Sequence, residues 1–483
     1  MMVTPRPRYH FTPPKNFMND PNGLVYYDGE YHLFYQHNPF GDVWGHMSWG
    51  HAVSTDLIHW EHLPVALHED SNGMIFSGSA VVDWQNTSGF GHNSRPPLIT
   101  IYTSHSEAEQ TQSIAYSLDR GRSWTKYTNN PVIAIGARDF RDPKVFWHEP
   151  TKRWIMVTAL SDQHKVRFNS SPDLKHWTDL SDFGPAGAVD GIWECPDLFP
   201  LPVEGNPELK KWVLKVDALK GTGAQYFIGE FDGTRFTNDA TDDQILRVDY
   251  GNDFYAAQSW SDLPVDRRIW IAWLNNWEYA NLIPTSPWRG LISIPRELYL
   301  RKYAEGLRLV QKPIEELKEL RQPVFQANGT DTDTINAQIV QLAMDNTLEL
   351  YTQFTIDSAI EFGIKISMSE TEKVVIGYDT KKQELFLDRT RSGDTTFSGN
   401  YADIHRAALI PERGKISLNI FIDTCSVEVF ANDGRVVISD LIFPKSQNIS
   451  VKFYARDGDV HLNKVDVWKI LAQAAVLGGG DAA

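Results

Sequence analysis

The chain has 483 residues, with 46 basic and 62 acidic side chains and a formal net charge of −16. A nucleic-acid or anionic membrane partner would require a basic stripe, which the sequence lacks, so both classes are excluded. The length predicts two or three domains, and no apolar run approaches the roughly 20 residues of a membrane span. The 16 Trp, 18 Tyr and 24 Phe fit a β-rich core and also fit stacking against sugar rings.

The N-terminal segment MMVTPRPRYHFTPP has charged residues and prolines but no apolar stretch, so it does not predict a signal peptide. We therefore expect either a cytoplasmic protein or a secreted one whose signal peptide is absent from this sequence. The next stretch, FMNDPNG at residues 17–23, is rich in turn formers and leads into the strand-like run LVYYDGEYHLFYQ. On its own, this stretch is as consistent with a plain hairpin turn as with a catalytic loop.

From residue 20 to about 300, short β-type runs alternate with turns, and no helical period persists. The strings STDLIHW, SLDRGRSW and SSPDLKHW end at Trp60, Trp124 and Trp177, and FDGTRF is a weaker fourth copy. A repeat of about 60 residues suits a four-stranded blade, so residues 1–305 are predicted to form a five-bladed β-propeller. The acidic residues of the repeat are expected to shape the blade turns; they are Asp56, Asp119 and Asp173.

The segment EGLRLVQKPIEELKELRQP then places Ile314, Leu317 and Leu320 at helical spacing after Pro313. This predicts a helical linker over residues 306–324. From 325 to 472, runs such as LELYTQFTI and KISLNIFID alternate apolar and polar residues, which is typical of a β-sandwich. The predicted fold class is therefore all-β, a five-bladed propeller followed by a sandwich, with a flexible tail at 473–483.

The two cysteines, Cys195 and Cys425, are too few for a disulfide framework, and Cys195 is interpreted as a packed thiol beside a carboxylate. Three carboxylates stand at predicted starts of innermost blade strands: Asp20, Asp142 and Glu194. Such positions converge on the central funnel of a propeller, and a pair of carboxylates is what glycoside hydrolysis requires.

The neighbours of these carboxylates suggest different roles for them. Apolar Trp193 and Cys195 flank Glu194 and favour its protonated form, which suits a general acid. Amide side chains and turn N–H groups around Asp20 favour an ionised nucleophile. The Arg141 guanidinium would keep its neighbour Asp142 ionised.

The strings FMNDPNG, FYQHNP, WGHMSWGHA, FSGS, RDPK, WECPD and NNW…TSPWRG occur in this order. Together they resemble the glycoside hydrolase family of invertases, levanases and exo-inulinases, the β-fructofuranosidases, over nearly the whole chain. The resemblance implies a retaining double displacement on a terminal β-fructofuranosyl unit, with no metal or cofactor. It implies Asp20 as nucleophile, Glu194 as general acid/base and Asp142 as a stabiliser of the transition state. The sugar-binding positions that it implies are Asn19, Asn22, Gln36, Trp44, Phe76, Ser77, Arg141, Asp253 and Trp288.

Several alternatives stay open at this point. Trp44 could be a core residue of a Trp-rich chain instead of a sugar platform. The scaffold could transfer fructose to a sugar acceptor instead of water, could bind carbohydrate without cleaving it, or could resemble an inverting arabinan-cleaving propeller. The expected partners are sucrose, fructo-oligosaccharides or fructan ends such as inulin and levan, and a homodimer is possible. The preference among these substrates is not predicted.

Overall fold

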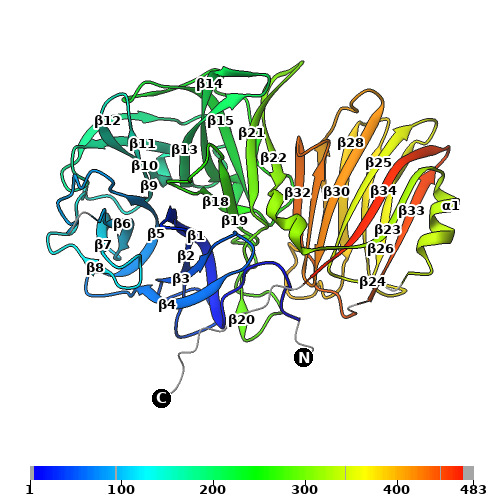
Figure 1. Ribbon diagram of the computed structural model, residues 1–483, viewed down its shortest axis with the longest axis horizontal. Helices are drawn as coiled ribbons and strands as arrows, with labels where there is room; N and C mark the ends of the chain where they lie inside the picture. Colours follow the sequence, from blue (N-terminus) through cyan, green and yellow to red (C-terminus); the bar gives the residue numbers. More distant parts are fainter. Residues whose placement is uncertain (1–4, 93–94, 343, 447, 472–483) are drawn as a thin grey trace.

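Two β-rich bodies lie side by side in the computed structural model, which describes residues 5–92, 95–342, 344–446 and 448–471 (Figure 1). The strands of the first body run from Asn16 to Pro313, and those of the second from Arg321 to Ile470. The predicted all-β fold is confirmed. The predicted tail at 473–483 lies outside the described residues. No helix of the described residues is long and apolar enough to cross a membrane.

The first body is a β-propeller whose blades are antiparallel sheets arranged around a centre (Figure 1). In each of the first three blades the earliest strand is innermost and the following strands pair outward in sequence. Blade one contains β1 (Asn16–Tyr27), β2 (Glu30–His37), β3 (Ser48–Ser54) and β4 (Glu61–Leu67), with β20 (Trp288–Arg289) joined in parallel to β1. Blade two contains β5 (Met74–Val82), β6 (Leu98–His105), β7 (Gln110–Ser117) and β8 (Thr125–Lys126). Blade three contains β9 (Phe140–His148), β10 (Arg153–Leu160), β11 (Lys165–Ser171) and β12 (Thr178–Phe183).

Blades four and five share hydrogen bonds at one point, because β13 and β21 pair in parallel at Val203 and Leu300. Blade four contains β13 (Glu194–Val203), β14 (Asn206–Ala218), β15 (Gly223–Phe231), β16 (Phe236–Asn238) and β17 (Leu246–Arg247). Blade five contains β18 (Tyr255–Ser259), β19 (Ile269–Trp273), β21 (Arg296–Tyr303) and β22 (Gly306–Pro313). The pairing of β20 with β1 at the start of the chain helps to close the ring of blades.

The turn that repeats in the sequence also repeats in the structure. In the first copy, Oγ of Ser54 lies 3.0 Å from Oδ1 of Asp56, and that oxygen accepts backbone N–H bonds from Ile58 and His59. The same Ser–Asp contact occurs at Asp119 and Asp173, at 2.8 and 3.2 Å. The indole N–H of the closing Trp donates to a backbone carbonyl three residues earlier in each copy. These aspartates therefore hold blade turns, as predicted.

The second body is a sandwich of two six-stranded antiparallel sheets whose facing side chains form one hydrophobic core. The first sheet contains β23 (Arg321–Thr330), β34 (Val460–Ile470), β25 (Leu348–Ile356), β30 (Lys415–Asp423), β31 (Ser426–Ala431) and β32 (Val436–Leu441). The second contains β24 (Met344–Asp345), β33 (Asn448–Arg456), β26 (Glu361–Ser367), β27 (Lys373–Asp379), β28 (Glu384–Arg391) and β29 (Ile404–Ala408). The sequence analysis missed the short helix α1 (Thr332–Ile339), whose N-terminus is capped by the Asp331 side chain.

The segment between the two bodies differs from the predicted helical linker over 306–324. Residues 306–313 are strand β22, and only Glu315–Leu320 are helical, as the 3-10 helix η3. Ile314, Leu317 and Leu320 are buried as their spacing suggested, in a cluster with residues of both bodies. Six residues between two strands are too few for an amphipathic α-helix, so the apolar spacing indicates a packed turn.

Candidate active site

The innermost strands bring their N-terminal ends together on the propeller axis, and each of them has an irregular register near that end. Shifts occur beside Met18 in β1, Phe76 in β5 and Glu194 in β13, and β9 and β18 are irregular as well. Asp142, Cys195 and Ala256 have φ of 65°, 46° and 56°, a region that non-glycine residues seldom adopt. Bulges of this kind re-aim side chains. The strained backbone therefore marks the funnel as a functional-site candidate.

Asp20 lies in β1 and is almost fully buried, at 7% exposure. Its Oδ2 accepts a 2.6 Å hydrogen bond from Ser77 Oγ, and its Oδ1 accepts a 3.0 Å bond from Asn19 Nδ2. Burial raises the pKa of the Asp20 carboxyl, the Ser77 bond lowers it, and the nearby Glu194 charge raises it again, with a net rise. The bond from the Asn19 amide lowers the pKa of Asp20 but does not outweigh burial, contrary to the expectation from its neighbours in sequence.

Asp142 lies in β9 and is held by the backbone of a neighbouring blade. Its Oδ2 accepts the N–H of Cys195 at 2.9 Å, and its own N–H donates to Thr103 Oγ1 at 3.0 Å. Burial raises the pKa of the Asp142 carboxyl; Arg141 opposes this rise, and the charges on Glu194 and Asp20 add to it.

Glu194 begins β13 and is the most accessible of the three carboxylates, at 16% side-chain exposure. Arg141 donates to its Oε1 through Nη2 at 2.9 Å and Nε at 3.1 Å, and the Tyr255 hydroxyl donates to Oε2 at 2.6 Å. The neighbours that the sequence analysis took as its environment point elsewhere, since the Trp193 indole is fully buried and donates to the Ala188 carbonyl. The contacts of the Glu194 carboxylate are therefore polar, which differs from the predicted apolar setting.

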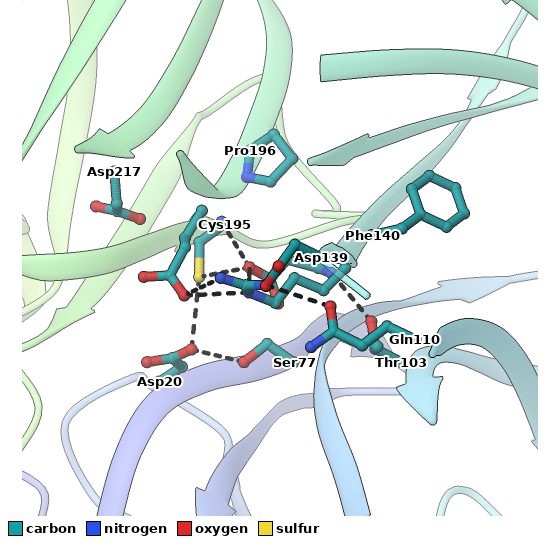
Figure 2. Close-up of polar contacts among 12 residues, drawn as sticks. Asp20, Ser77, Thr103, Gln110, Asp139, Phe140, Cys195, Pro196 and Asp217 are labelled. Atoms are coloured by element: carbon teal, nitrogen blue, oxygen red, sulfur yellow. Dashed lines mark hydrogen bonds and ion pairs between the residues drawn. The ribbon is translucent and has the colours of Figure 1, made fainter. Parts of the chain in front are cut away.

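Cys195 lies next to Asp20 (Figure 2), and its sulfur contacts two of the three carboxylates. Its Sγ is 3.4 Å from Asp20 Oδ2 and 3.5 Å from Asp142 Oδ2. Burial raises the pKa of the thiol well above its usual value, and the adjacent carboxylates raise it further. The interpretation of Cys195 as a packed thiol beside a carboxylate is therefore confirmed, because a thiol in this setting stays protonated and is a weak donor.

A buried ion pair supports this arrangement from behind. Lys215 Nζ contacts the Asp217 carboxylate and donates to the carbonyls of Cys195 and Ala257 at 3.1 and 2.9 Å. Lys215 and Asp217 are both fully buried. The lysine thus ties the bulged segment of β13 to β18, which fixes the backbone on which Glu194 stands.

Several of the predicted sugar-binding residues surround this centre. Asn22 Oδ1 accepts from Gln36 Nε2 at 2.8 Å, and the same nitrogen contacts the Ile75 carbonyl, so Gln36 orients Asn22. Trp44 is 38% exposed, and its ring lies 6.0 Å from that of Phe76. The alternative of Trp44 as a core residue does not fit that exposure, whereas a rim position does.

Asp253 and Trp288 lie elsewhere. The Asp253 carboxylate is fully buried, and its oxygens accept bonds from Asn276 Nδ2, the Tyr279 hydroxyl and the N–H of Leu441 in the sandwich, at 2.9, 2.6 and 2.8 Å. It also pairs with Arg389 of the sandwich. The Trp288 side chain is only 2% exposed and packs in a cluster shared by both bodies. Neither side chain is open to a sugar in this structure.

Tyr255 contacts Glu194 but was not predicted from the sequence, although it lies in the same NDFYAAQSW string as Asp253. Strand β18 begins at Tyr255, so Asp253 precedes it and strand alternation does not relate the two side chains. The Tyr255 hydroxyl contacts Glu194 in the funnel, whereas Asp253 lies at the domain interface. Gln110 and Asp139 were also missed; they accept from Arg141 Nη1 at 3.2 and 2.9 Å (Figure 2).

Comparison with known families gives two adjacent matches. The description "Glycosyl hydrolases family 32 N-terminal domain" matches residues 10–313, and "Glycosyl hydrolases family 32 C terminal" matches residues 316–469. The two matches meet at the short segment between the propeller and the sandwich.

Curated and solved relatives cover almost the whole chain. A levanase of Bacillus subtilis is 49% identical over 474 residues, which are 96% of this chain and 70% of that protein. An extracellular exo-inulinase of Aspergillus ficuum is 40% identical, covering 96% of this chain and 94% of that one. The crystal structure of an exo-inulinase from Aspergillus awamori aligns with a TM-score of 0.90 at 38% identity, over 98% of this chain and all of that one. A Schwanniomyces occidentalis fructofuranosidase complexed with fructose aligns with a TM-score of 0.88 at 33% identity, over 97% and 99%.

Proposed function

The chain belongs to glycosyl hydrolase family 32, and we propose that Asp20, Glu194 and Asp142 carry its reaction. The enzyme is an exo-acting β-fructofuranosidase that acts on fructans or sucrose. The observation that supports these three residues most is the arrangement around Cys195. Its sulfur contacts Asp20 and Asp142, while Arg141, the neighbour of Asp142, holds Glu194.

In the first step, an Asp20 oxygen attacks C2 of the terminal fructosyl unit, and the C2–O bond to the leaving group breaks. Glu194 gives its proton to the departing oxygen, so the leaving sugar departs as a neutral alcohol. The hydrogen bonds from Ser77 and Asn19 fix the Asp20 carboxylate and limit its rotation before attack. Burial of Asp20 removes hydration from the nucleophile, which the raised pKa also reflects.

In the second step, Glu194 takes a proton from water, and the resulting oxygen attacks C2 and displaces Asp20. Arg141 and Tyr255 donate to the two carboxylate oxygens of Glu194 and hold it in place through both steps. Once Asp20 is an ester, the site carries one negative charge fewer than before the attack.

Burial raises the pKa of Asp142, and in its ionised form this carboxylate stabilises the positive charge that develops at C2 in the transition state. Its carboxylate is fixed by the Cys195 N–H, and Arg141 offsets part of the repulsion that Asp20 adds. Asn19, Asn22, Trp44, Phe76, Ser77 and Arg141 would line the fructosyl position, with Gln36 orienting Asn22. Asp253 and Trp288, by their contacts, would instead support the site from the domain interface.

The test is the release of fructose and glucose from sucrose, inulin and levan. Asp20→Ala should abolish release from all three, with unchanged folding by circular dichroism. Glu194→Ala should hydrolyse all three substrates slowly. Added azide should restore its turnover on an activated fructoside by attacking the intermediate. The anomer released first, followed by NMR, should be the β-furanose. An initial α-furanose, or full activity of Asp20→Ala, would refute the assignment.

We infer an extracellular place of action, with support from the same relatives. The exo-inulinase relatives are named extracellular, and a polymer such as levan cannot reach a cytoplasmic enzyme without a transporter. This supports an extracellular setting over the cytoplasmic alternative. Recovery of activity in the culture medium of the source cells, instead of the cell lysate, would test it.

A further inference from the structure

A large cavity lies at the end of the propeller opposite the candidate active site. It has a volume of about 700 Å³ and is lined by the C-terminal ends of innermost strands, including Val82 of β5 and His148 of β9. The catalytic candidates stand at the other ends of those strands. His148 lies six positions after Asp142 in β9, which corresponds to about 20 Å along the strand. The cavity is therefore separate from the funnel.

Aromatic rings form much of the cavity wall. Those that line it are Trp84, Phe146, Trp147, Trp154, Trp212 and Phe231. Trp84 stands at the edge and is 60% exposed, which is unusual for an indole. Two of the rings are held in place by carboxylates. Trp84 Nε1–H donates to Asp262 at 2.9 Å, and Trp147 Nε1–H donates to Glu149 at 2.7 Å.

The charges inside the cavity are balanced. Lys144 lies 3.4 Å from Asp197 and donates to the Ser259 carbonyl, and Arg268 faces the charges of Asp197 and Asp262. Burial lowers the pKa of Arg268, and these carboxylates oppose that effect. A cavity with balanced charge does not favour an anion. Fixed aromatic faces with a few polar groups instead suit a neutral ligand that has both C–H faces and hydroxyl groups.

We propose that this cavity is a second, non-catalytic carbohydrate site that binds a segment of a fructan chain. The inference rests on the activity toward fructans, which supplies a neutral polyhydroxylated ligand of the required chemistry. Fructosyl rings would pack on the exposed face of Trp84 and enter between Trp147 and Trp212. Binding there would keep the enzyme on a polymer between cleavages without contributing to the chemistry. Sucrose, which already fits the catalytic site by itself, would gain nothing from it.

The test compares Trp84→Ala with Trp468→Ala, which removes a half-buried indole of the sandwich far from the cavity. Trp84→Ala should raise KM for long-chain levan by about fivefold and leave sucrose kinetics within about twofold, since one aromatic contact contributes on the order of 1 kcal/mol. Trp84→Phe should have an intermediate effect, because it keeps an aromatic face and loses the bond to Asp262. Trp468→Ala should leave the KM for levan and the kinetics on sucrose unchanged.

Binding without turnover separates this inference from the catalytic assignment. In the Asp20→Ala background, migration through a gel containing levan should be retarded, and adding Trp84→Ala should reduce the retardation. A gel containing dextran should retard neither protein. Three results would overturn the proposal. The first is a Trp84→Ala variant whose KM for levan and retardation by levan are both unchanged. The second is an equal loss of activity on levan and on sucrose, and the third is retardation by dextran equal to that by levan. Residual activity of Asp20→Ala would instead refute the nucleophile and leave the binding result interpretable.

Discussion

Replacing Asp253 by Asn should destabilise the contact between the propeller and the sandwich far more than it affects sugar binding. The carboxylate is fully buried and pairs with the fully buried Arg389. Arg389 keeps a second partner, Asp440, 3.5 Å away. The substitution therefore leaves a buried cation only partly compensated.

The size of the effect follows from these contacts. Removing one partner of a buried ion pair typically destabilises by about 3–5 kcal/mol. The introduced amide would keep one oxygen acceptor, and Asp440 would keep part of the attraction for Arg389, so we take the lower end, about 3 kcal/mol. For a domain of 150–250 residues, this corresponds to a fall in Tm of about 6–12 °C.

The assay is thermal unfolding by calorimetry, combined with KM and kcat for sucrose at a temperature where both proteins are folded. Tm should fall, and KM should stay within about twofold. Arg389→Met alone should also destabilise, and the double variant should be less destabilised than the sum of the two, because the two residues act as one pair. A clear rise in KM with an unchanged Tm would refute this reasoning and return Asp253 to the sugar site.

Three further outcomes are expected. Tyr255→Phe should lower kcat about tenfold with an unchanged Tm, because its hydroxyl donates a 2.6 Å bond to Glu194; an unchanged kcat would contradict this role. Burial lowers the pKa of His10, but bonds to two buried carboxylates outweigh it and raise the pKa to about 9. Protonated His10 therefore stabilises the folded state by about 3 kcal/mol, a contribution that is complete below pH 6.5 and is lost as pH rises through 9. The amount by which His10→Gln lowers Tm should accordingly shrink between pH 6 and 10. A loss of Tm that does not vary with pH would contradict the predicted pH dependence. Cys195 and Cys425 are buried with raised pKa values, so a thiol reagent should label neither in the native enzyme and both after unfolding.

The sequence predicted the features that depend on local chemistry repeated along the chain. The Ser-x-Asp turn needs only a hydroxyl, a carboxylate and a following aromatic, so its copies at Asp56, Asp119 and Asp173 could be recognised and counted. The pattern of short strands also predicted the start of β13 at Glu194. Alternating strands likewise predicted the sandwich. These features depend on residues close together in the sequence, so they can be recognised without knowledge of tertiary contacts.

The features that failed depend on long-range contacts. Asp253 and Tyr255 are two residues apart, yet one pairs with the sandwich and the other with Glu194. No local pattern shows that β18 begins only at Tyr255 and that Asp253 lies before it, against the sandwich. Trp288 has a polar sequence neighbourhood but packs under residues from both bodies. The spacing of Leu317 and Leu320 is equally compatible with an α-helix and with the 3-10 turn that the short connection permits.

The same long-range contacts explain how the funnel tolerates three carboxylates. Each is placed by a residue from another blade: Ser77 for Asp20, the Cys195 N–H for Asp142, and Arg141 for Glu194. A like-charged cluster would repel itself apart if it stood on mobile loops, since two charges 4 Å apart at an effective dielectric constant of 20 interact by about 4 kcal/mol. Rigid strands with positive-φ bulges prevent that relaxation. The repulsion is thereby retained in the free enzyme and falls when the first step converts Asp20 into a neutral ester, so the scaffold favours the change of charge that the reaction requires.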